Sequence, residues 1–237
     1  MDNKDFIDAY KTDDKITSDY YKLRDNKGKL IDLTGTICPL RIDNRQLMSP
    51  TDNQTVTPHC AGYSAATLVE SLLWKRSGKL KQLDSHQVYA LAKKIDGEVQ
   101  MDGTYLEAAM KAVLTLCKKD PEFSFLDDAK VGLFYNDNTD VTIQITKDLI
   151  HRYDFLQVGF NIDEGWYTCT QNNYVLRPHG RSLGGHAVNL CGYDEDGFYV
   201  MNQWSIDFGS KGFAIMPYDM FLKQFMYGAY LYNYKAI

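Results

Sequence analysis

The sequence lacks the features that would tie it to a membrane or to a nucleic acid. No apolar run approaches the roughly 20 residues that a membrane-spanning helix needs, and no apolar signal-peptide stretch follows the polar residues 1–5. Acidic residues outnumber basic ones, 31 to 26, so the basic face that phosphate backbones require is missing. We therefore expect a soluble protein, cytoplasmic rather than secreted, that binds neither nucleic acid nor membrane.

Cysteine is also scarce and widely spaced. The five cysteines form no Cys-x-x-Cys pair, so a zinc ribbon is not expected and no metal ion is predicted. Cys117 and Cys191 lie in apolar runs, where a thiol behaves as a small buried hydrophobe. Cys38 and Cys169 could pair, but mostly free thiols in a reducing compartment are the simpler expectation.

The 237 residues change character along the chain. Apolar residues recur at helical spacing over 60–76, 85–95 and 105–116. Helices followed by strands indicate an α+β protein. We predict an N-terminal extension, a helical lobe that carries the nucleophile and a β-rich lobe that carries the other catalytic residues, at 1–40, 41–125 and 126–237.

After Pro121, short segments rich in β-branched and aromatic residues alternate with Gly, Asp and Asn turns, which is typical of strands. One stretch is ambiguous, because 141–146 alternates like a strand while 145–153 fits a short helix equally well. An active site between the two lobes is expected, since ligand pockets form preferentially at such interfaces. The predicted strands are 131–135, 155–162, 187–193, 197–203 and 212–216.

Cys60 stands at the start of the clearest predicted helix. A helix N-terminus carries partial positive charge and free N–H groups, which favour a thiolate over a thiol. Most of the residues that follow are small and would let another segment approach closely, namely Ala61, Gly62, Ser64, Ala65 and Ala66. Taken alone, however, a cysteine is more often a buried structural residue, so its role depends on what else the sequence supplies.

A second motif places a histidine at the entrance to the predicted strand 187–193, where His186 follows Gly184 and Gly185. The turn signal at 194–197 joins this strand to the next in a hairpin. Pairing outward from the turn sets positions near 186 opposite positions near 204, which brings Asn202 close to His186. The amide oxygen of Asn202 could then accept the imidazole N–H and fix its tautomer.

Two further residues complete this group. Trp204 follows Asn202 closely and could shield the His186–Asn202 bond from water. Gln54 precedes Cys60 by six residues, and its amide could donate, with the backbone N–H of Cys60, to an oxyanion on an attacked carbonyl. A loop glutamine alone carries no signal, so this assignment depends on the rest of the group.

Four ordered segments, within about residues 42–225, resemble the papain-type cysteine peptidases. Residues 43–60 (Asp-Asn-Arg-Gln-Leu-Met-Ser-Pro-Thr-Asp-Asn-Gln-Thr-Val-Thr-Pro-His-Cys) look like the stretch that leads to that family's catalytic Cys. Residues 185–193, which begin Gly-His-Ala-Val, look like the stretch around its catalytic His. Residues 202–204 (Asn-Gln-Trp) with 208–213 resemble its Asn-Ser-Trp segment, and 83–87 resemble a helix start of the family.

The resemblance implies a papain-like α+β fold, with a helical N-terminal lobe packed on a β-rich C-terminal lobe. It implies no cofactor, and a peptide or protein as the substrate. The roles that it implies are nucleophile, base, orienting amide and oxyanion donor for Cys60, His186, Asn202 and Gln54. The substrate contacts that it suggests are a Gly-rich strip and the neighbours of the catalytic residues, namely Gly103, Thr104, Gly185, Trp204 and His59.

The chain departs from the family around the nucleophile. Residues 57–61 read Thr-Pro-His-Cys-Ala where the family has Cys-Gly-Ser-Cys-Trp. The first Cys, which normally forms a disulfide, is therefore Thr57, and the aromatic residue is Ala61. His59 is expected to narrow or polarise the first substrate pocket. Only about 40 residues precede the similarity, so we expect a compact bacterial-like or viral-like member without a long prosegment.

Three functions fit such a site. A peptidase would use the Cys60 thiolate to attack a peptide carbonyl, and His186 would protonate the leaving amine. A transamidase, deamidase or amidase would pass through the same thioester. A catalytically silent binding module on the same fold is the third possibility, kept open by the altered residues Pro58, His59 and Ala61.

Overall fold

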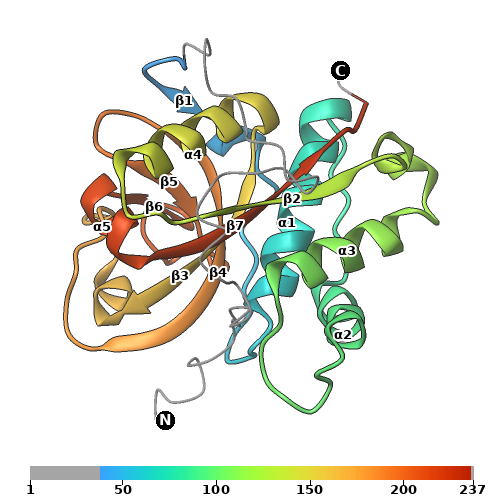
Figure 1. Ribbon diagram of the computed structural model, residues 1–237, viewed down its shortest axis with the longest axis horizontal. Helices are drawn as coiled ribbons and strands as arrows, with labels where there is room; N and C mark the ends of the chain where they lie inside the picture. The colour runs from blue at the N-terminus through green and yellow to red at the C-terminus, as the bar shows by residue number, and fades with distance from the viewer. Residues whose placement is uncertain (1–37, 236–237) are drawn as a thin grey trace.

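The computed structural model of the chain describes residues 38–235 (Figure 1). The extension predicted at 1–40 lies outside the described residues, apart from its last three. Helices come first along the chain and strands dominate afterwards, as predicted for an α+β protein. None of the helices in the described part of the chain is long and apolar enough to cross a membrane.

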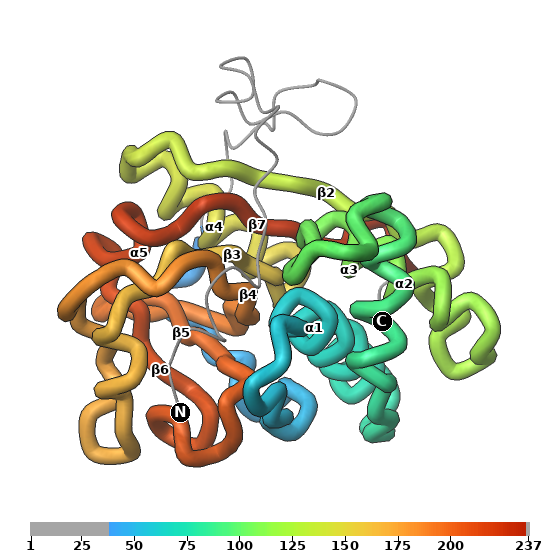
Figure 2. Tube along the Cα trace, turned by 90° about the horizontal axis from the view of Figure 1, so that it is seen from below, coloured from blue at the N-terminus to red at the C-terminus, as the bar shows by residue number. Residues whose placement is uncertain are grey.

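Three helices form the first half, each within one residue of its predicted bounds: α1 (Cys60–Ser77), α2 (Ser85–Asp96) and α3 (Leu106–Cys117). Asp84 caps α2 by accepting hydrogen bonds from two backbone N–H groups. Gly78 is the C-cap residue of α1, and its left-handed φ of 66° is one that glycine adopts without steric cost. α1 is buried for most of its length because it lies between the sheet and α2 (Figure 2).

The strands form one seven-stranded antiparallel sheet in the order β2-β7-β3-β4-β5-β6, and β1 pairs with β4 off this path. The short β1 belongs to the sheet although it falls in the range predicted for the helical lobe. The strands are β1 (Ile42–Asp43), β2 (Lys130–Tyr135), β3 (Leu156–Asp163), β4 (Ser182–Tyr193), β5 (Phe198–Met201), β6 (Phe213–Met216) and β7 (Phe225–Tyr232).

The ambiguous stretch after β2 is a helix, α4 (Asp140–Tyr153). Thr139 caps it by accepting the backbone N–H of Val141. A strand would bury Val141, Ile143 and Ile145 together on one face. Instead Val141 is 49% exposed, and the buried residues continue at helical spacing to Leu149. The alternation was therefore too short to identify the element.

Three features of the sheet differ from the sequence-based expectations. β4 begins at Ser182, so His186 lies inside the strand and not at its entrance. α5 (Tyr218–Gln224) and β7 were not predicted at all. β7 lies between β2 and β3 and is buried over most of its length, which removes the alternation that marks a half-exposed strand.

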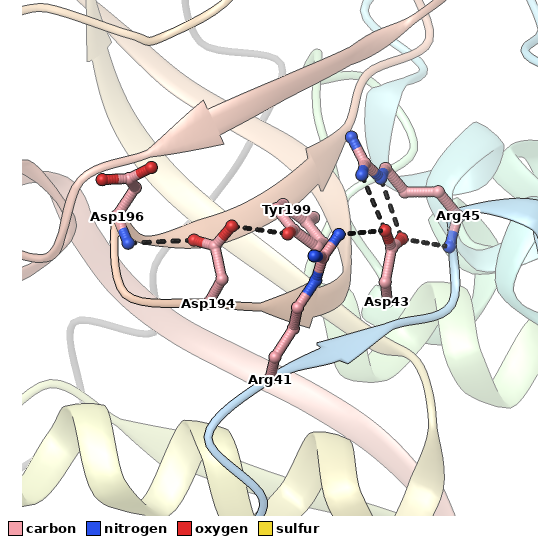
Figure 3. A network of polar contacts seen from close by, with 6 residues as sticks. All are labelled: Arg41, Asp43, Arg45, Asp194, Asp196 and Tyr199. Atoms are coloured by element: carbon pink, nitrogen blue, oxygen red, sulfur yellow. Dashed lines mark hydrogen bonds and ion pairs between the residues drawn. The ribbon is translucent and has the colours of Figure 1, made fainter.

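A polar network ties β1 to the turn of the β4–β5 hairpin (Figure 3). The carboxylate of Asp43 accepts from Nε and Nη2 of Arg45 at 2.8 and 2.7 Å, which lowers the pKa of Asp43 to about 2. The Arg45 guanidinium lies 4.2 Å from the centre of the Tyr199 ring, and the Tyr199 hydroxyl donates to Asp194 at 2.6 Å. The segment that leads to α1 is thus fixed to the hairpin that carries His186.

Candidate active site

Cys60 is the first residue of α1 and is completely buried. No side chain caps this helix end. The backbone N–H groups of Ala187, Ala61 and Cys60 itself lie within hydrogen-bonding reach of the thiol. Burial raises the pKa of the Cys60 thiol to about 11, and these three N–H groups oppose that rise. The contact with Ala187 brings the thiol next to the residue that follows His186.

The β4–β5 hairpin brings His186 and Asn202 together. Tyr193 pairs with Phe198 directly across the predicted turn at 194–197, and the register slips by one residue farther along the hairpin. Nε2 of His186 lies 2.8 Å from Oδ1 of Asn202. Because a carboxamide oxygen can only accept, this contact assigns the proton to Nε2 and leaves Nδ1 as the basic nitrogen.

Aromatic rings enclose the imidazole of His186. Trp204 stacks on it with ring centroids 4.9 Å apart, and Trp166 meets it edge-on at 5.9 Å. Tyr167 in turn stacks on Trp204 at 5.3 Å. Burial lowers the pKa of His186 to about 4, opposed by its hydrogen bond to Asn202. Burial therefore favours the neutral imidazole over the imidazolium.

Gln54 lies in the loop before α1 and is buried. Its backbone N–H donates to the carbonyl of Gln203 at 2.9 Å, which fixes the loop to the segment after β5. Its side-chain Nε2 donates to the carbonyl of Thr57 at 3.1 Å. That bond uses one of the two amide hydrogens, so the second is left for another acceptor.

His59 precedes Cys60 and points toward α2. Its Nδ1 lies 2.8 Å from Nδ1 of His86, and its ring stacks on Tyr89 at a centroid distance of 3.9 Å. The hydroxyl of Tyr63 lies 3.2 Å from Nε2 of His86. Burial, and then the neighbouring His86, lower the pKa of His59 to about 4. One of the two facing Nδ1 atoms must donate to the other in this contact.

Of the two residues in the predicted substrate strip, Gly103 contacts Tyr89 of α2 and Thr104 is turned into the interior. The Gly103 N–H donates to the Tyr89 hydroxyl at 3.0 Å, and the Gly103 carbonyl accepts from Lys93 at 2.8 Å. Thr104 is completely buried, and its hydroxyl donates to Asp96 at 2.7 Å. Thr104 therefore supports the strip from behind. Gly185 is half-buried within β4.

Several neighbours of the site carried no recognisable sequence signal. The backbone N–H of Ala187 and the rings of Trp166 and His86 reach the site only through the tertiary fold. Cys38 and Cys169 are both free thiols, so the disulfide considered between them is absent. The remaining three cysteines are also free, as the simpler expectation had it.

Known structures share this fold. No protein-family model matches the chain. Xylellain, a cysteine protease from Xylella fastidiosa, superposes with a TM-score of 0.63 at 18% identity, over 84% of this chain and 88% of that one. The Amb a 11 cysteine protease of ragweed pollen, in its proform, gives 0.64 at 16% identity, over 86% and 69%. The chain therefore has the α+β fold of papain-like cysteine proteases, as predicted.

One part of the chain is also similar in sequence to a curated protein. It is 37% identical over 62 residues to cathepsin B-like cysteine proteinase 5 of Caenorhabditis elegans. The match covers 24% of this chain and 18% of that protein, so it spans only about a fifth of the relative's length.

Proposed function

We propose that the chain is a cysteine peptidase of the papain type, and that its closer kinship is with compact bacterial or viral members. One observation carries the proposal. Nε2 of His186 lies 2.8 Å from Oδ1 of Asn202, and the backbone N–H of Ala187, the residue after His186, contacts the Cys60 thiol. A thiol, an imidazole and an amide arranged in this way would serve as nucleophile, base and orienting group. This is the arrangement that acyl transfer through a thioester needs.

The first step is a proton transfer from Sγ of Cys60 to Nδ1 of His186. Burial disfavours an isolated thiolate and an isolated imidazolium, as the two shifted pKa values express. An internal transfer creates both charges together, so each stabilises the other and no net charge is buried. The partial positive charge at the start of α1 favours the thiolate further.

The thiolate then attacks the carbonyl carbon of the substrate amide. The resulting oxyanion accepts from the second Nε2–H of Gln54 and from the backbone N–H of Cys60. The C–N bond breaks as His186 gives its proton to the leaving amine, which leaves an acyl thioester on Cys60. Water, deprotonated by His186, hydrolyses the thioester and restores the thiol.

The substrate is a peptide or protein chain, bound across the junction of α1 and the sheet. Gly103, Gly185 and Trp204 would contact it on either side of Cys60, with Thr104 behind the strip. His59, held by His86, would form a neutral polar wall beside the nucleophile. Such a wall can donate or accept a hydrogen bond, because a neutral imidazole has one N–H donor and one acceptor nitrogen.

One observation favours a silent binding module as the second candidate. Both Cys60 and His186 are buried, and burial favours the neutral thiol and the neutral imidazole. In such a module the internal proton transfer would not occur. Cys60 would then behave as an ordinary buried thiol.

Labelling by an epoxide-type thiol inhibitor separates these two functions. A peptidase is expected to be labelled at Cys60 at mildly acidic pH, and Cys60→Ala should abolish both the label and peptide cleavage. Cys117→Ala, which removes a thiol buried elsewhere, is the matched control and should leave both intact. Faster labelling of Cys38 or Cys169 would contradict the nucleophile assignment. Ammonia release or amine incorporation in place of peptide cleavage would point to the amidase or transamidase reading.

A further inference from the structure

A chain of buried polar side chains joins α1 to the sheet beneath the proposed active site. Its members are one hydroxyl and three carboxamides, from α1, β3, β4 and the segment after β5, and each is 0% exposed. We call them the buried amide chain: Ser64, Gln157, Asn189 and Gln203. None of the proposed catalytic steps uses these residues.

At its helix end, the buried amide chain is hydrogen-bonded to the first turn of α1. Nε2 of Gln157 donates to the carbonyl of Ala61 and to the hydroxyl oxygen of Ser64, both at 2.8 Å. The Ser64 hydroxyl donates to the carbonyl of Cys60, also at 2.8 Å. These bonds act on Cys60 and on the residue that follows it, so they bear directly on where the thiol lies.

At its sheet end, the buried amide chain extends to Gln203, the residue that follows Asn202. Nδ2 of Asn189 donates to the carbonyl of Ser64, and Nε2 of Gln203 donates to Oδ1 of Asn189, both at 3.0 Å. Gln157 and Asn189 face each other in the β3–β4 register. Gln203 is next to Asn202, and its carbonyl accepts from the backbone N–H of Gln54. One connected set of bonds therefore spans from Cys60 to the neighbours of Asn202 and Gln54.

A contribution to stability does not by itself explain why the buried amide chain is polar. The Oε1 atoms of Gln157 and Gln203 are buried and have no hydrogen-bond partner among residues 38–235. A buried acceptor without a partner is unfavourable, and apolar side chains of the same size would avoid that cost. Apolar contacts, however, are non-directional and do not fix a helix along a sheet. Hydrogen bonds to carbonyls in the first turn of α1 are directional and can therefore fix the position of the helix along the sheet.

We infer that the buried amide chain is a positioning device that sets Cys60 of α1 against His186 and Asn202 of the sheet. The inference rests on the proposed function, because it concerns the geometry of that same site. Internal proton transfer needs the thiol and the imidazole in a fixed relation, and a displacement of about 1 Å can cost about a hundredfold in rate. Gln157 and Ser64 act through Cys60 and touch no substrate, so they are positioning residues.

The test compares two variants of the chain with a control. Gln157→Met keeps the size of the side chain but removes its donors, and Ser64→Ala removes the hydroxyl while favouring the helix. Asn136→Leu is the matched control, since its amide also joins separate segments, at 2.8 and 2.7 Å to the carbonyls of Leu222 and Phe225. None of its side-chain hydrogen bonds within residues 38–235 reaches α1. Thermal unfolding reports whether each variant folds.

The decisive readout is the rate of Cys60 alkylation by iodoacetamide from about pH 4 to about pH 9, a range that covers imidazole and thiol titration. We expect Gln157→Met and Ser64→Ala to fold but to lose at least about tenfold of the rate at mildly acidic pH, where only an ion-paired thiolate reacts. On a peptide substrate, kcat should fall by a similar factor while KM stays within about twofold. Asn136→Leu should lower the unfolding temperature and leave the alkylation profile unchanged.

A wild-type profile in folded Gln157→Met and Ser64→Ala would overturn the inference, and so would failure of both variants to fold. If only Gln157→Met fails to fold, Ser64→Ala decides. A wild-type protein that shows the low-pH reactivity but cleaves no peptide would contradict the peptidase proposal. The alkylation comparison would still test the positioning role in that case. A wild-type protein whose Cys60 does not react at mildly acidic pH would overturn both the peptidase proposal and the positioning role.

Discussion

The indole of Trp204 lies over the imidazole of His186, with centroids 4.9 Å apart and the planes 28° from parallel. The stack covers the ring whose Nε2 contacts Asn202, and it contributes to the burial that lowers the pKa of His186 to about 4. The imidazole is thereby held neutral, in one tautomer and one orientation. That is the state in which it can accept the thiol proton.

Removal of the stack should therefore raise the pKa of His186. In Trp204→Ala water reaches the imidazole, and we expect its pKa to move from about 4 toward the ordinary value of about 6.5. Trp204→Phe keeps an aromatic face and should move it less. An NMR titration of the histidine side chains measures this, with the exposed His151 and His179 as internal references. An unchanged His186 titration in Trp204→Ala would show that other groups control its burial.

The network around Asp43 gives an expectation for stability in acid. The hydrogen bonds from Arg45 lower the pKa of Asp43 to about 2, below the value of about 3.9 in the unfolded chain. The ionised carboxylate therefore stabilises the fold above about pH 3.9, and this stabilisation is lost as the pH falls toward 2. Asp43→Asn should therefore be less stable than wild type at pH 7, by no more than about 1 kcal/mol for a pair that is only partly buried. Urea unfolding should show the difference closing between about pH 4 and about pH 2. Asp219→Asn, at an exposed pair with Lys223, should show almost no difference, and a pH-independent gap for Asp43→Asn would contradict the expectation.

The sequence was most informative where local rules decide the structure. The start of α1 at Cys60 and the turn at 194–197 followed from helical spacing and turn residues, and counting back from the turn brought Asn202 to His186. Local rules failed for β7, because a strand buried between two neighbours does not alternate. They also failed for Gln157, whose hydrogen bond to Ser64 joins residues 93 positions apart. No local pattern indicates such a contact, since it exists only once α1 has packed on the sheet.

His186 and Asn202 should differ in how much activity depends on them. His186→Ala removes the group that accepts and returns the proton, so we expect peptide cleavage to be abolished. Asn202→Ala removes only the partner that fixes the tautomer, and Trp204 and Trp166 still hold the ring, so a measurable fraction of kcat should remain. Steady-state kinetics on one peptide substrate measures both variants. Wild-type activity in His186→Ala would remove this residue from the mechanism.

Gln54 is the member of the site with the weakest sequence signal and the sharpest kinetic expectation. One hydrogen of its Nε2 is used by the Thr57 carbonyl, which aims the amide and leaves the other for the oxyanion. The oxyanion exists only near the transition state, so Gln54→Ala should lower kcat and kcat/KM together, by about 100-fold to 1,000-fold, with KM nearly constant. Gln54→Glu should be at least as damaging, because a carboxylate repels the developing negative charge. Gln171→Ala, at an exposed loop glutamine, is the control and should match wild type. If Gln54→Ala also stays within about twofold of wild type, the oxyanion must be bound by other donors, such as the neighbouring His59.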